Sequence, residues 1–436
     1  MIRQNFNADW TVEKGDGNSR MNSFLGNTQT KTVHLPYDAM IHEARTPDTK
    51  NGAQTGFYPG GEYIFQKHFT APQAWQGKSV SLVFEGVYQT ALVYLNGWLL
   101  TRNVNGYAEF TVEAGPYLKY GADNLLKVIA DNSLEPNSRW YTGSGIYRPV
   151  RLLVGNKVYL PQDTVRITTR EADEGFALLD VTAQVQSAST VTERVTLQQT
   201  ICREGTAVLT DRQNLLLQPG ESRTVSFRYC VDSPALWSPE NPNLYTSTMQ
   251  VLEGEEELDR EETSFGIRTL SIDAAHGVRI NGQTVKLRGA CIHHDNGILG
   301  AATLPDAEER RIRQLKEAGF NAIRSSHHPA GRALLDACDR YGVLVMDELS
   351  DVWNVRKNPY DYALYFEQDW KPTIQKMVAK DYNHPSVIMY CVGNEISEAG
   401  SESGAETNRR LCNTFRELDP TRYTTNALNG LMAAGY

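Results

Sequence analysis

The chain has 436 residues, of which 40% are hydrophobic and 22% are charged, and this composition is typical of a folded globular protein. Its length predicts about two to four domains. The formal net charge of −9 and the lack of a basic stripe argue against nucleic acid as a partner.

The N-terminus and the cysteines bear on where the protein works. The segment MIRQNFNADWTVEK is polar and lacks the apolar core of a signal peptide, and no stretch approaches the ~18 apolar residues of a membrane span. We therefore expect a cytoplasmic protein that spans no membrane. The six cysteines show no C-x-x-C spacing, so free buried thiols are favoured over a zinc ribbon or a disulfide framework. A Cys202–Cys230 disulfide is the alternative.

Residues 1–158 are predicted to form a β-sandwich of the jelly-roll type. Short runs of alternating polar and apolar residues are separated by turns rich in glycine and asparagine. These runs include 79–84, 91–95 and 125–130. The dipeptides Asn96-Gly97 and Asn105-Gly106 are typical of β-hairpin turns.

Residues 159–271 keep a period near two, as in 191–201 and 223–228, and their number suits a second sandwich of the immunoglobulin type. The segment 236–245 contains two prolines. Because proline cannot donate a hydrogen bond to a neighbouring strand, this segment is not predicted to be a central strand.

Residues 272–436 change character, since strands now alternate with helices. The predicted strands are 285–292, 320–325, 343–346, 386–391 and 422–428. The predicted helices are 306–319, 332–342, 369–382 and 405–418. This alternation indicates parallel βαβ units, and we interpret it as the first five strands of a (β/α)8 TIM barrel.

Polar residues follow four consecutive strands of this predicted barrel. They are His293-His294, Ser325-Ser326-His327-His328, Asp347-Glu348 and Asn394-Glu395. Active sites of such barrels are built at the carboxyl ends of the strands. The pattern therefore predicts a catalytic site at this end of the barrel.

Several motifs resemble one enzyme family. In the barrel region they are LRGACIHHDNG, GFNAIRSSHHP, CDRYGVLVMDE and NHPSVIMYCVGNEI; before it they are LPYDAMI, SRWYTGSGIYRPVRL and FGIRTLSID. Together they closely resemble glycoside hydrolase family 2, the family of β-galactosidases and β-glucuronidases. The resemblance covers almost the whole chain and implies a jelly-roll domain, an immunoglobulin-like domain and a TIM barrel.

The resemblance also implies roles for single residues. Glu395 matches the general acid/base of these retaining exo-glycosidases, and Asn394 matches the residue that contacts the sugar 2-hydroxyl. His293 and His327 match histidines presented to the sugar, and Arg324 matches an arginine beside the catalytic carboxylates.

Arg139 stands where some relatives have an aspartate that reaches the sugar, so we expect it to make a different substrate contact. Val352 and Asn354 stand where some relatives bind magnesium, and we expect neither a metal nor another cofactor. The cluster His293-His294-Asp295 is compatible with a metal site, but neighbouring side chains in an extended segment point to opposite faces, so we favour sugar binding.

Two further assignments stay open at this point. Asp347 and Glu348 either contact the substrate or hold arginine and histidine side chains near the acid. Trp140 and Tyr141 either stack on a sugar or belong to the sandwich core.

Retaining glycosidases need two carboxylates, one as acid/base and one as nucleophile. In the family the nucleophile follows the seventh strand, roughly 90 residues after the acid at about 30 residues for each βα unit. Only 41 residues follow Glu395. We therefore expect a longer chain with the nucleophile beyond Tyr436, and we regard Glu348 as the weaker alternative.

The favoured function is a retaining exo-β-glycosidase, with a β-galactoside as the first substrate and a β-glucuronide as the second. Its partner is then a carbohydrate or glycoconjugate, and the full-length protein is expected to be a homo-oligomer. The alternative from another class is a carbohydrate-binding protein without activity.

Overall fold

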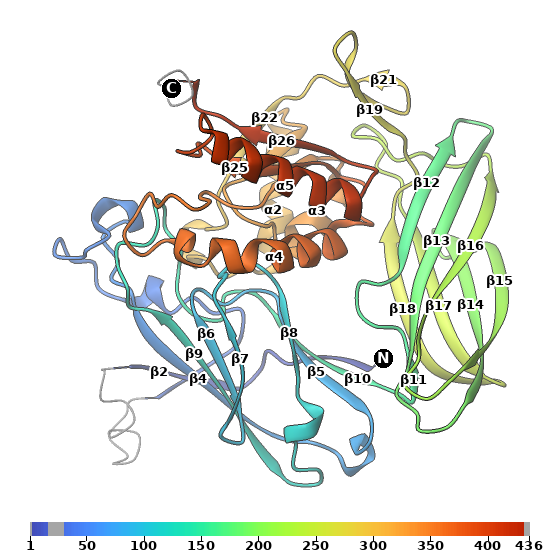
Figure 1. Cartoon of the computed structure of the whole chain (residues 1–436), viewed down its shortest axis with the longest axis horizontal. Coiled ribbons are helices and arrows are strands. Elements are labelled where there is room, and N and C mark those ends of the chain that lie inside the picture. Colours follow the sequence, from blue (N-terminus) through green and yellow to red (C-terminus); the bar gives the residue numbers. More distant parts are fainter. Residues whose placement is uncertain (1, 16–29, 431–436) are drawn as a thin grey trace.

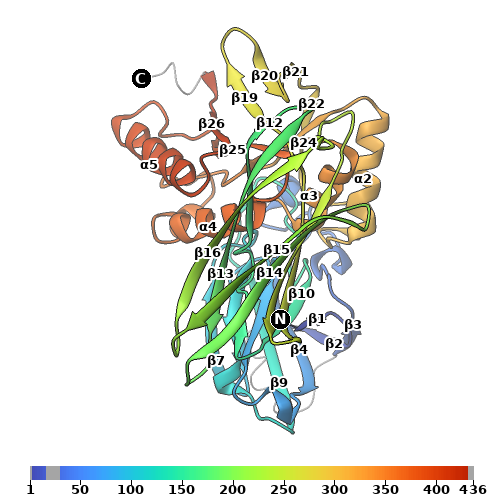
Figure 2. The same cartoon turned by 90° about the vertical axis from the view of Figure 1, so that its right-hand side faces the viewer.

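The computed structural model describes residues 2–15 and 30–430. Two β-sandwiches lie beside a parallel sheet that carries helices (Figure 1). Viewed from the side, the second sandwich stands in front of the other two parts (Figure 2). The multidomain fold predicted from the sequence, with two sandwiches and a partial TIM barrel, is confirmed.

The first sandwich has a four-stranded and a six-stranded sheet. The four-stranded sheet has the order β1 (Ile2–Asn5), β10 (Val150–Gly155), β5 (Ser79–Phe84), β8 (Phe110–Glu113). The six-stranded sheet has the order β3 (Lys31–Val33), β2 (Trp10–Lys14), β4 (Gly61–Thr70), β9 (Asp123–Asn132), β6 (Ala91–Leu95), β7 (Trp98–Asn103). Inward-facing side chains such as Leu82 and Val128 alternate with outward polar ones and form the core between the sheets.

One hairpin prediction in this sandwich is right and the other is wrong. Asn96-Gly97 joins the paired strands β6 and β7. Asn105-Gly106 instead connects β7 to β8, which belongs to the other sheet. The Asn105 side-chain oxygen accepts hydrogen bonds from the backbone N–H groups of Tyr107 and Ala108, so this dipeptide stabilises a crossing loop rather than a hairpin turn.

The second sandwich is confirmed as two four-stranded sheets. In one sheet β13 (Phe176–Ser187) pairs with β11 (Val158–Tyr159), β12 (Arg166–Ala172) and β16 (Ser222–Asp232). The other has the order β15 (Thr206–Leu217), β14 (Glu193–Arg203), β17 (Tyr245–Glu253), β18 (Glu256–Phe265). As predicted, the proline-containing segment before β17 forms no strand, and its residues Trp237 and Pro242 form only an isolated bridge.

A small sheet precedes the barrel region and consists of β19 (Leu270–Asp273), β20 (Gly277–Ile280) and β21 (Gln283–Thr284). The parallel sheet follows in chain order as β22 (Gly289–Ile292), β23 (Ala322–Ser325), β24 (Leu344–Glu348), β25 (Val387–Asn394) and β26 (Tyr423–Ala427). The helices are α2 (Pro305–Glu317), α3 (Arg332–Tyr341), α4 (Phe366–Asp381) and α5 (Glu402–Leu418). Helices α2 and α3 pack together, as do α4 and α5 (Figure 1, Figure 2).

Several predicted boundaries in this region are wrong by three residues or more. The strand predicted at 285–292 is confined to β22, because the backbone of Arg288 is bonded to the side chain and N–H of Asn321 before the parallel pairing begins. The helix predicted at 369–382 begins three residues earlier, at Phe366, and contains Pro372. Short 3-10 helices occupy Met40–His42, Gly52–Thr55, Gln73–Trp75, Gly115–Tyr117, Gly297–Leu299 and Tyr362–Leu364.

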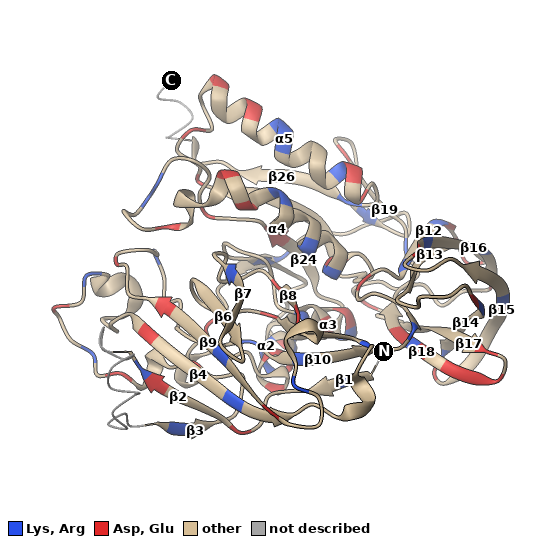
Figure 3. Ribbon diagram, turned by 60° about the horizontal axis from the view of Figure 1, so that its bottom comes forward, with Lys and Arg blue, Asp and Glu red and all other residues tan. Residues whose placement is uncertain are grey.

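Acidic and basic residues are interspersed along the ribbon (Figure 3). No helix in the described ranges is long and apolar enough to cross a bilayer. All six cysteines are free, but only Cys338, Cys391 and Cys412 are buried, so the expectation of buried thiols fails for the exposed Cys230 and Cys291.

Candidate active site

Glu395 directly follows β25, the fourth strand of the parallel sheet. Its φ of 45° lies in the left-handed region, and its N–H donates to the carbonyl of Ala427 at 2.8 Å, so the backbone turns sharply at the strand end. The side chain is 42% exposed. The buried strand thus ends in a carboxylate that is accessible from outside.

Glu348 is a buried acceptor for two of the predicted site residues. Its Oε1 accepts a hydrogen bond of 2.5 Å from Nη2 of Arg324, and its Oε2 lies 2.8 Å from Nδ1 of His327. The Glu348 side chain has no exposed surface. Burial alone would lower the pKa of Arg324. The charge of Glu348 raises this pKa by more, so the pKa of Arg324 lies above its ordinary value. Of the two roles considered for Glu348, substrate contact and support of nearby side chains, the structure shows the second: Glu348 holds Arg324 and His327.

Asn394 has a fixed amide orientation. Its Oδ1 accepts from Nη2 of Arg324 at 2.9 Å, and its Nδ2 donates to Oδ1 of Asp351 at 2.8 Å. Because an amide nitrogen carries two hydrogens, one N–H remains for another acceptor. Asn394 is placed to act as a donor beside Glu395.

Arg139 reaches this site from the first sandwich. Its Nη1 donates to Oε2 of Glu395 at 3.4 Å, while its Nε and Nη2 donate to Asp351 at 3.0 and 2.6 Å. Lys357 Nζ donates to Oδ1 of Asp351 at 3.0 Å and to the carbonyl of Asn394 at 2.7 Å. Asp351 is therefore contacted both by Arg139 from the sandwich loop and by Lys357 from the barrel loop.

Asp351 and Lys357 are site residues that the sequence analysis missed. Burial raises the pKa of Asp351, but the hydrogen bond from Arg139 and the charge of Lys357 lower it more, and the net pKa is below the ordinary value. Burial lowers the pKa of Lys357. The signal available in the sequence was an acidic residue in the loop that follows the third barrel strand.

Three rings form a wall of the site. The ring of Trp140 lies 5.1 Å from that of His293 and 5.7 Å from that of His327, measured between centroids. Burial, followed by the nearby His327, lowers the pKa of His293, and the Nδ1 of His293 has no hydrogen-bond partner in the described structure. This wall suits a sugar face together with a polar contact.

The open assignments of neighbouring residues can now be decided. His294 is buried, its Nε2 lies 2.9 Å from the carbonyl of Thr142, and burial lowers its pKa to about 3. Tyr141 donates to Oδ2 of Asp38 at 2.6 Å. Neither residue faces the site as Trp140 does, so both are structural.

Val352 stands at one of the two positions where some relatives hold magnesium, and its side chain has no ligand atom. Among the described residues, the metal-ligating side chains that lie close enough to share an ion are those of Asp336, Asp339 and His384. His384 precedes β25, at the end of the strand opposite Glu395.

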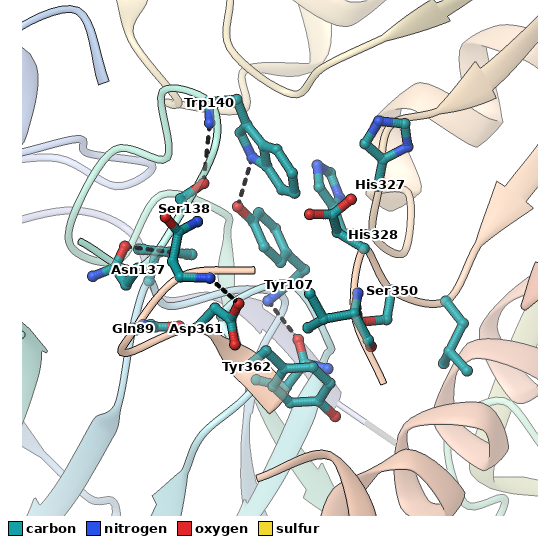
Figure 4. Close-up of a pocket in the computed structure, with 17 residues that line it drawn as sticks. Gln89, Tyr107, Asn137, Ser138, Trp140, His327, His328, Ser350, Asp361 and Tyr362 are labelled. Atoms are coloured by element: carbon teal, nitrogen blue, oxygen red, sulfur yellow. Dashed lines mark hydrogen bonds between the residues drawn. The ribbon is translucent and has the colours of Figure 1, made fainter. Parts of the chain in front are cut away.

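A cavity opens between the sandwich loops and the barrel strand ends (Figure 4). It is lined by rings, amides and carboxylates, among them Tyr107, Trp140, Tyr362, Asn105, Asn137 and Asp361. The indole N–H of Trp140 donates to the hydroxyl of Tyr107 at 3.0 Å, which fixes the plane of the indole. Asp351 also lines the cavity and links it through Arg139 to Glu395.

Taken together, the predicted residues Glu395, Asn394, Arg324, His327 and His293 lie at the carboxyl ends of neighbouring strands, and Arg139 joins them from the sandwich. An accessible carboxylate beside fixed donors and aromatic rings can transfer a proton to or from a polar ligand. This combination of rings and hydrogen-bonding groups is also suited to a carbohydrate.

Comparison with protein families assigns all three parts of the chain. Residues 10–176 match the "Glycosyl hydrolase 2 galactose-binding domain-like" model, residues 158–268 match "Glycosyl hydrolases family 2", and residues 274–432 match "Glycosyl hydrolases family 2, TIM barrel domain".

Individual relatives agree with this assignment. Beta-galactosidase BoGH2A of Bacteroides ovatus is 37% identical over 406 residues, which cover 93% of this chain and 48% of that protein. A putative beta-glucuronidase of Formosa agariphila is 31% identical over 427 residues, which cover 98% of this chain and 40% of that protein. The chain spans about half the length of these relatives.

Solved structures also match. A glycosyl hydrolase family 2 member from Bacteroides cellulosilyticus superposes with a TM-score of 0.94 at 37% identity, over 98% of this chain and 56% of that one. A beta-glucuronidase of Bacteroides uniformis superposes with a TM-score of 0.85 at 28% identity, over 98% of this chain and 52% of that one.

Proposed function

Because the chain belongs to glycosyl hydrolase family 2, we propose that the complete protein is a retaining exo-β-glycosidase with Glu395 as its general acid/base. The observation that carries this proposal is the position of Glu395, a half-exposed carboxylate directly after the fourth barrel strand and next to an amide of fixed orientation. Carboxylates at strand ends carry the chemistry of TIM barrels.

The chemistry needs an acid because a glycosidic oxygen leaves poorly unless it is protonated as the bond breaks. Glu395 would donate this proton while a second carboxylate, about 5 to 5.5 Å away, attacks the anomeric carbon. Glu395 would then take a proton from water as the glycosyl-enzyme is hydrolysed. Asn394 would offer its remaining N–H to a sugar hydroxyl.

We further propose that the attacking carboxylate comes from outside these 436 residues and not from Glu348. The side chain of Glu348 is fully buried, and its two oxygens are held by Arg324 and His327. A nucleophile must be able to reach the anomeric carbon of the sugar.

For the substrate we propose a neutral β-linked sugar, with galactose before glucuronic acid. Among the residues that the structure describes, those lining the cavity include Asp351 and Asp361 but no lysine or arginine. The nearby cations Arg139 and Lys357 are already paired with Asp351. A uronate carboxylate would therefore meet acidic groups there, and the beta-galactosidase relative at 37% identity supports the same choice.

The test is hydrolysis of nitrophenyl β-galactoside and nitrophenyl β-glucuronide by the complete protein, with the anomer of the first product followed by NMR. We expect the galactoside to be cleaved faster and with retention. Faster cleavage of the glucuronide would reverse the substrate order. Binding of sugars without cleavage of either compound would favour a carbohydrate-binding protein instead.

A further inference from the structure

Arg139 lies between two carboxylates and does not share its hydrogen bonds equally between them. Two of its N–H groups go to Asp351, at 2.6 and 3.0 Å, and only one reaches Glu395, at 3.4 Å. The pair with Asp351 is the bidentate arrangement that makes arginine–carboxylate contacts strong. The contact with Glu395 is long and single.

Asp351 is itself held in place from three sides. Besides Arg139, it accepts hydrogen bonds from Nδ2 of Asn394 at 2.8 Å and from Nζ of Lys357 at 3.0 Å. Its side chain is only 10% exposed. Asp351 therefore forms a rigid anchor for the guanidinium of Arg139.

We propose that Asp351 is a positioning residue, which keeps Arg139 from forming a bidentate pair with Glu395 and so leaves the acid free to take up the proton that it donates. This inference rests on the proposed glycosidase function. It concerns a residue that acts on Glu395 through Arg139.

The physical reason is the effect of an arginine on a neighbouring acid. A guanidinium in full contact with a carboxylate favours the charged form and lowers its pKa by about 1 to 3 units. Glu395 must be protonated before it can act as an acid. A direct, bidentate pair between Arg139 and Glu395 would keep the carboxylate ionised and suppress catalysis at neutral pH.

The charged groups around Glu395 come from two loops and from two strands, β23 and β24. Arg139 comes from the sandwich loop, and Asp351 and Lys357 come from the loop after β24. The Arg324–Glu348 pair contacts the site through Asn394. If Asp351 loses its charge, Arg139 keeps Glu395 as its only carboxylate partner among the contacts described above.

The experiment compares the pH profile of kcat/KM for the complete wild-type protein, Asp351→Asn and Arg139→Gln, on a β-glycoside whose leaving group needs a proton. The basic limb of this profile reports the acid of the free enzyme. We expect Asp351→Asn to move this limb down by about one pH unit or more, and Arg139→Gln to move it up. A loss of activity with an unmoved limb, or an upward shift in Asp351→Asn, would overturn the proposal.

The double variant Arg139→Gln/Asp351→Asn separates positioning from a direct charge effect. If Asp351 acts through Arg139, the double variant has the same basic limb as Arg139→Gln. If the charge of Asp351 acts directly on Glu395, the basic limb of the double variant lies below that of Arg139→Gln, and the proposal fails. This comparison also decides the matter if Asp351→Asn alone does not fold.

Failure of the proposed function gives a different result. A wild-type protein that cleaves none of the glycosides contradicts the glycosidase assignment itself. A wild-type protein that is active, together with Asp351→Asn of unchanged profile, contradicts only the role of Asp351.

Discussion

His327 and Glu348 are joined by a hydrogen bond of 2.8 Å between Nδ1 and Oε2, although they belong to the ends of different strands. The second oxygen of Glu348 is bonded to Arg324. One buried carboxylate thus orients two side chains at the edge of the cavity. The pair shows how the barrel end is held together beneath the proposed acid.

Replacement of Glu348 by Gln should weaken both folding and catalysis. Arg324 would lose the negative charge that compensates its own, so we expect the free energy of unfolding to fall by about 3 kcal/mol. A misplaced His327 should also lower kcat/KM at least about ten-fold. Denaturant unfolding and steady-state kinetics measure the two effects. Glu309→Gln is the control, since its exposed pair with Arg340 is worth at most about 1 kcal/mol. Equal stability of the two variants would contradict this view.

A covalent trap should leave Glu348 unmodified. A 2-fluoro glycoside with a good leaving group forms a slow-turnover ester with the nucleophile of a retaining enzyme. After digestion of the labelled complete protein, we expect mass spectrometry to find the sugar on a carboxylate outside residues 1–436. Label on the peptide that contains Glu348 would make that residue the nucleophile.

Glu395→Gln should reveal the acid role through the leaving group. Glycosides whose leaving groups need a proton should lose about 100-fold or more in kcat/KM, whereas strongly activated aryl glycosides should lose far less in the glycosylation step. Substrate binding should change little, because Gln keeps the size of the side chain. Losses that are equal across leaving groups, in an assay limited by glycosylation, would exclude Glu395 as the acid.

The site could be predicted from the sequence wherever a strand end determines the position of a residue. The carboxyl ends of parallel strands meet at one edge, so His293, Arg324, His327, Asn394 and Glu395 fall together once the βαβ alternation is recognised. No knowledge of the loops is needed for that step.

Asp351 and Lys357 could not be predicted in this way. They lie in the irregular loop between β24 and α4, where no periodicity determines which way a side chain points. The roles of the neighbours Trp140 and Tyr141 could not be predicted either. Tyr141 is structural because it donates to Asp38, whereas Trp140 lines the cavity, and the sequence shows neither contact. The hairpin prediction at Asn105-Gly106 was wrong because the same dipeptide also suits a loop that crosses from one sheet to the other.

Cys291 offers a chemical test of the barrel interior. It is exposed and lines an apolar cavity beside β22 and β23, together with Leu287, Ala290 and Met346. We expect a thiol reagent to label Cys291 rapidly in the isolated 436-residue polypeptide and at least about ten-fold more slowly in the complete protein, where further strands would cover it. Cys230, exposed on the second sandwich, is the internal control and should react equally in both. Equal labelling of Cys291 would contradict closure of the barrel over this cavity.

A group of buried charges lies near the strand ends and should make stability depend on pH. Lys380 forms ion pairs with Asp381 and, at 3.7 Å, with Asp347. Asp347 is fixed by hydrogen bonds from the hydroxyl of Ser325 and the N–H of Ala330. Burial, with a further contribution from Asp347, raises the pKa of Asp381 to about 7, although Lys380 acts in the opposite direction. Asp381 is therefore protonated more readily in the folded protein than in the unfolded chain.

The sign of the pH dependence follows from this raised pKa. Unfolded Asp381 titrates near pH 4, so its contribution to stability is fully present below that pH and is lost as the pH rises through about 7. The loss is at most about 4 kcal/mol. Asp381→Asn is uncharged at every pH, so we expect its free energy of unfolding, relative to wild type, to rise from pH 5 to about pH 7 and to level off above that pH. Asp180→Asn is the control, because the pKa of Asp180, set first by its hydrogen bond from Arg228, is about 2 and it does not titrate in this range. A difference between Asp381→Asn and wild type that stays constant with pH would show that Asp381 is ionised throughout.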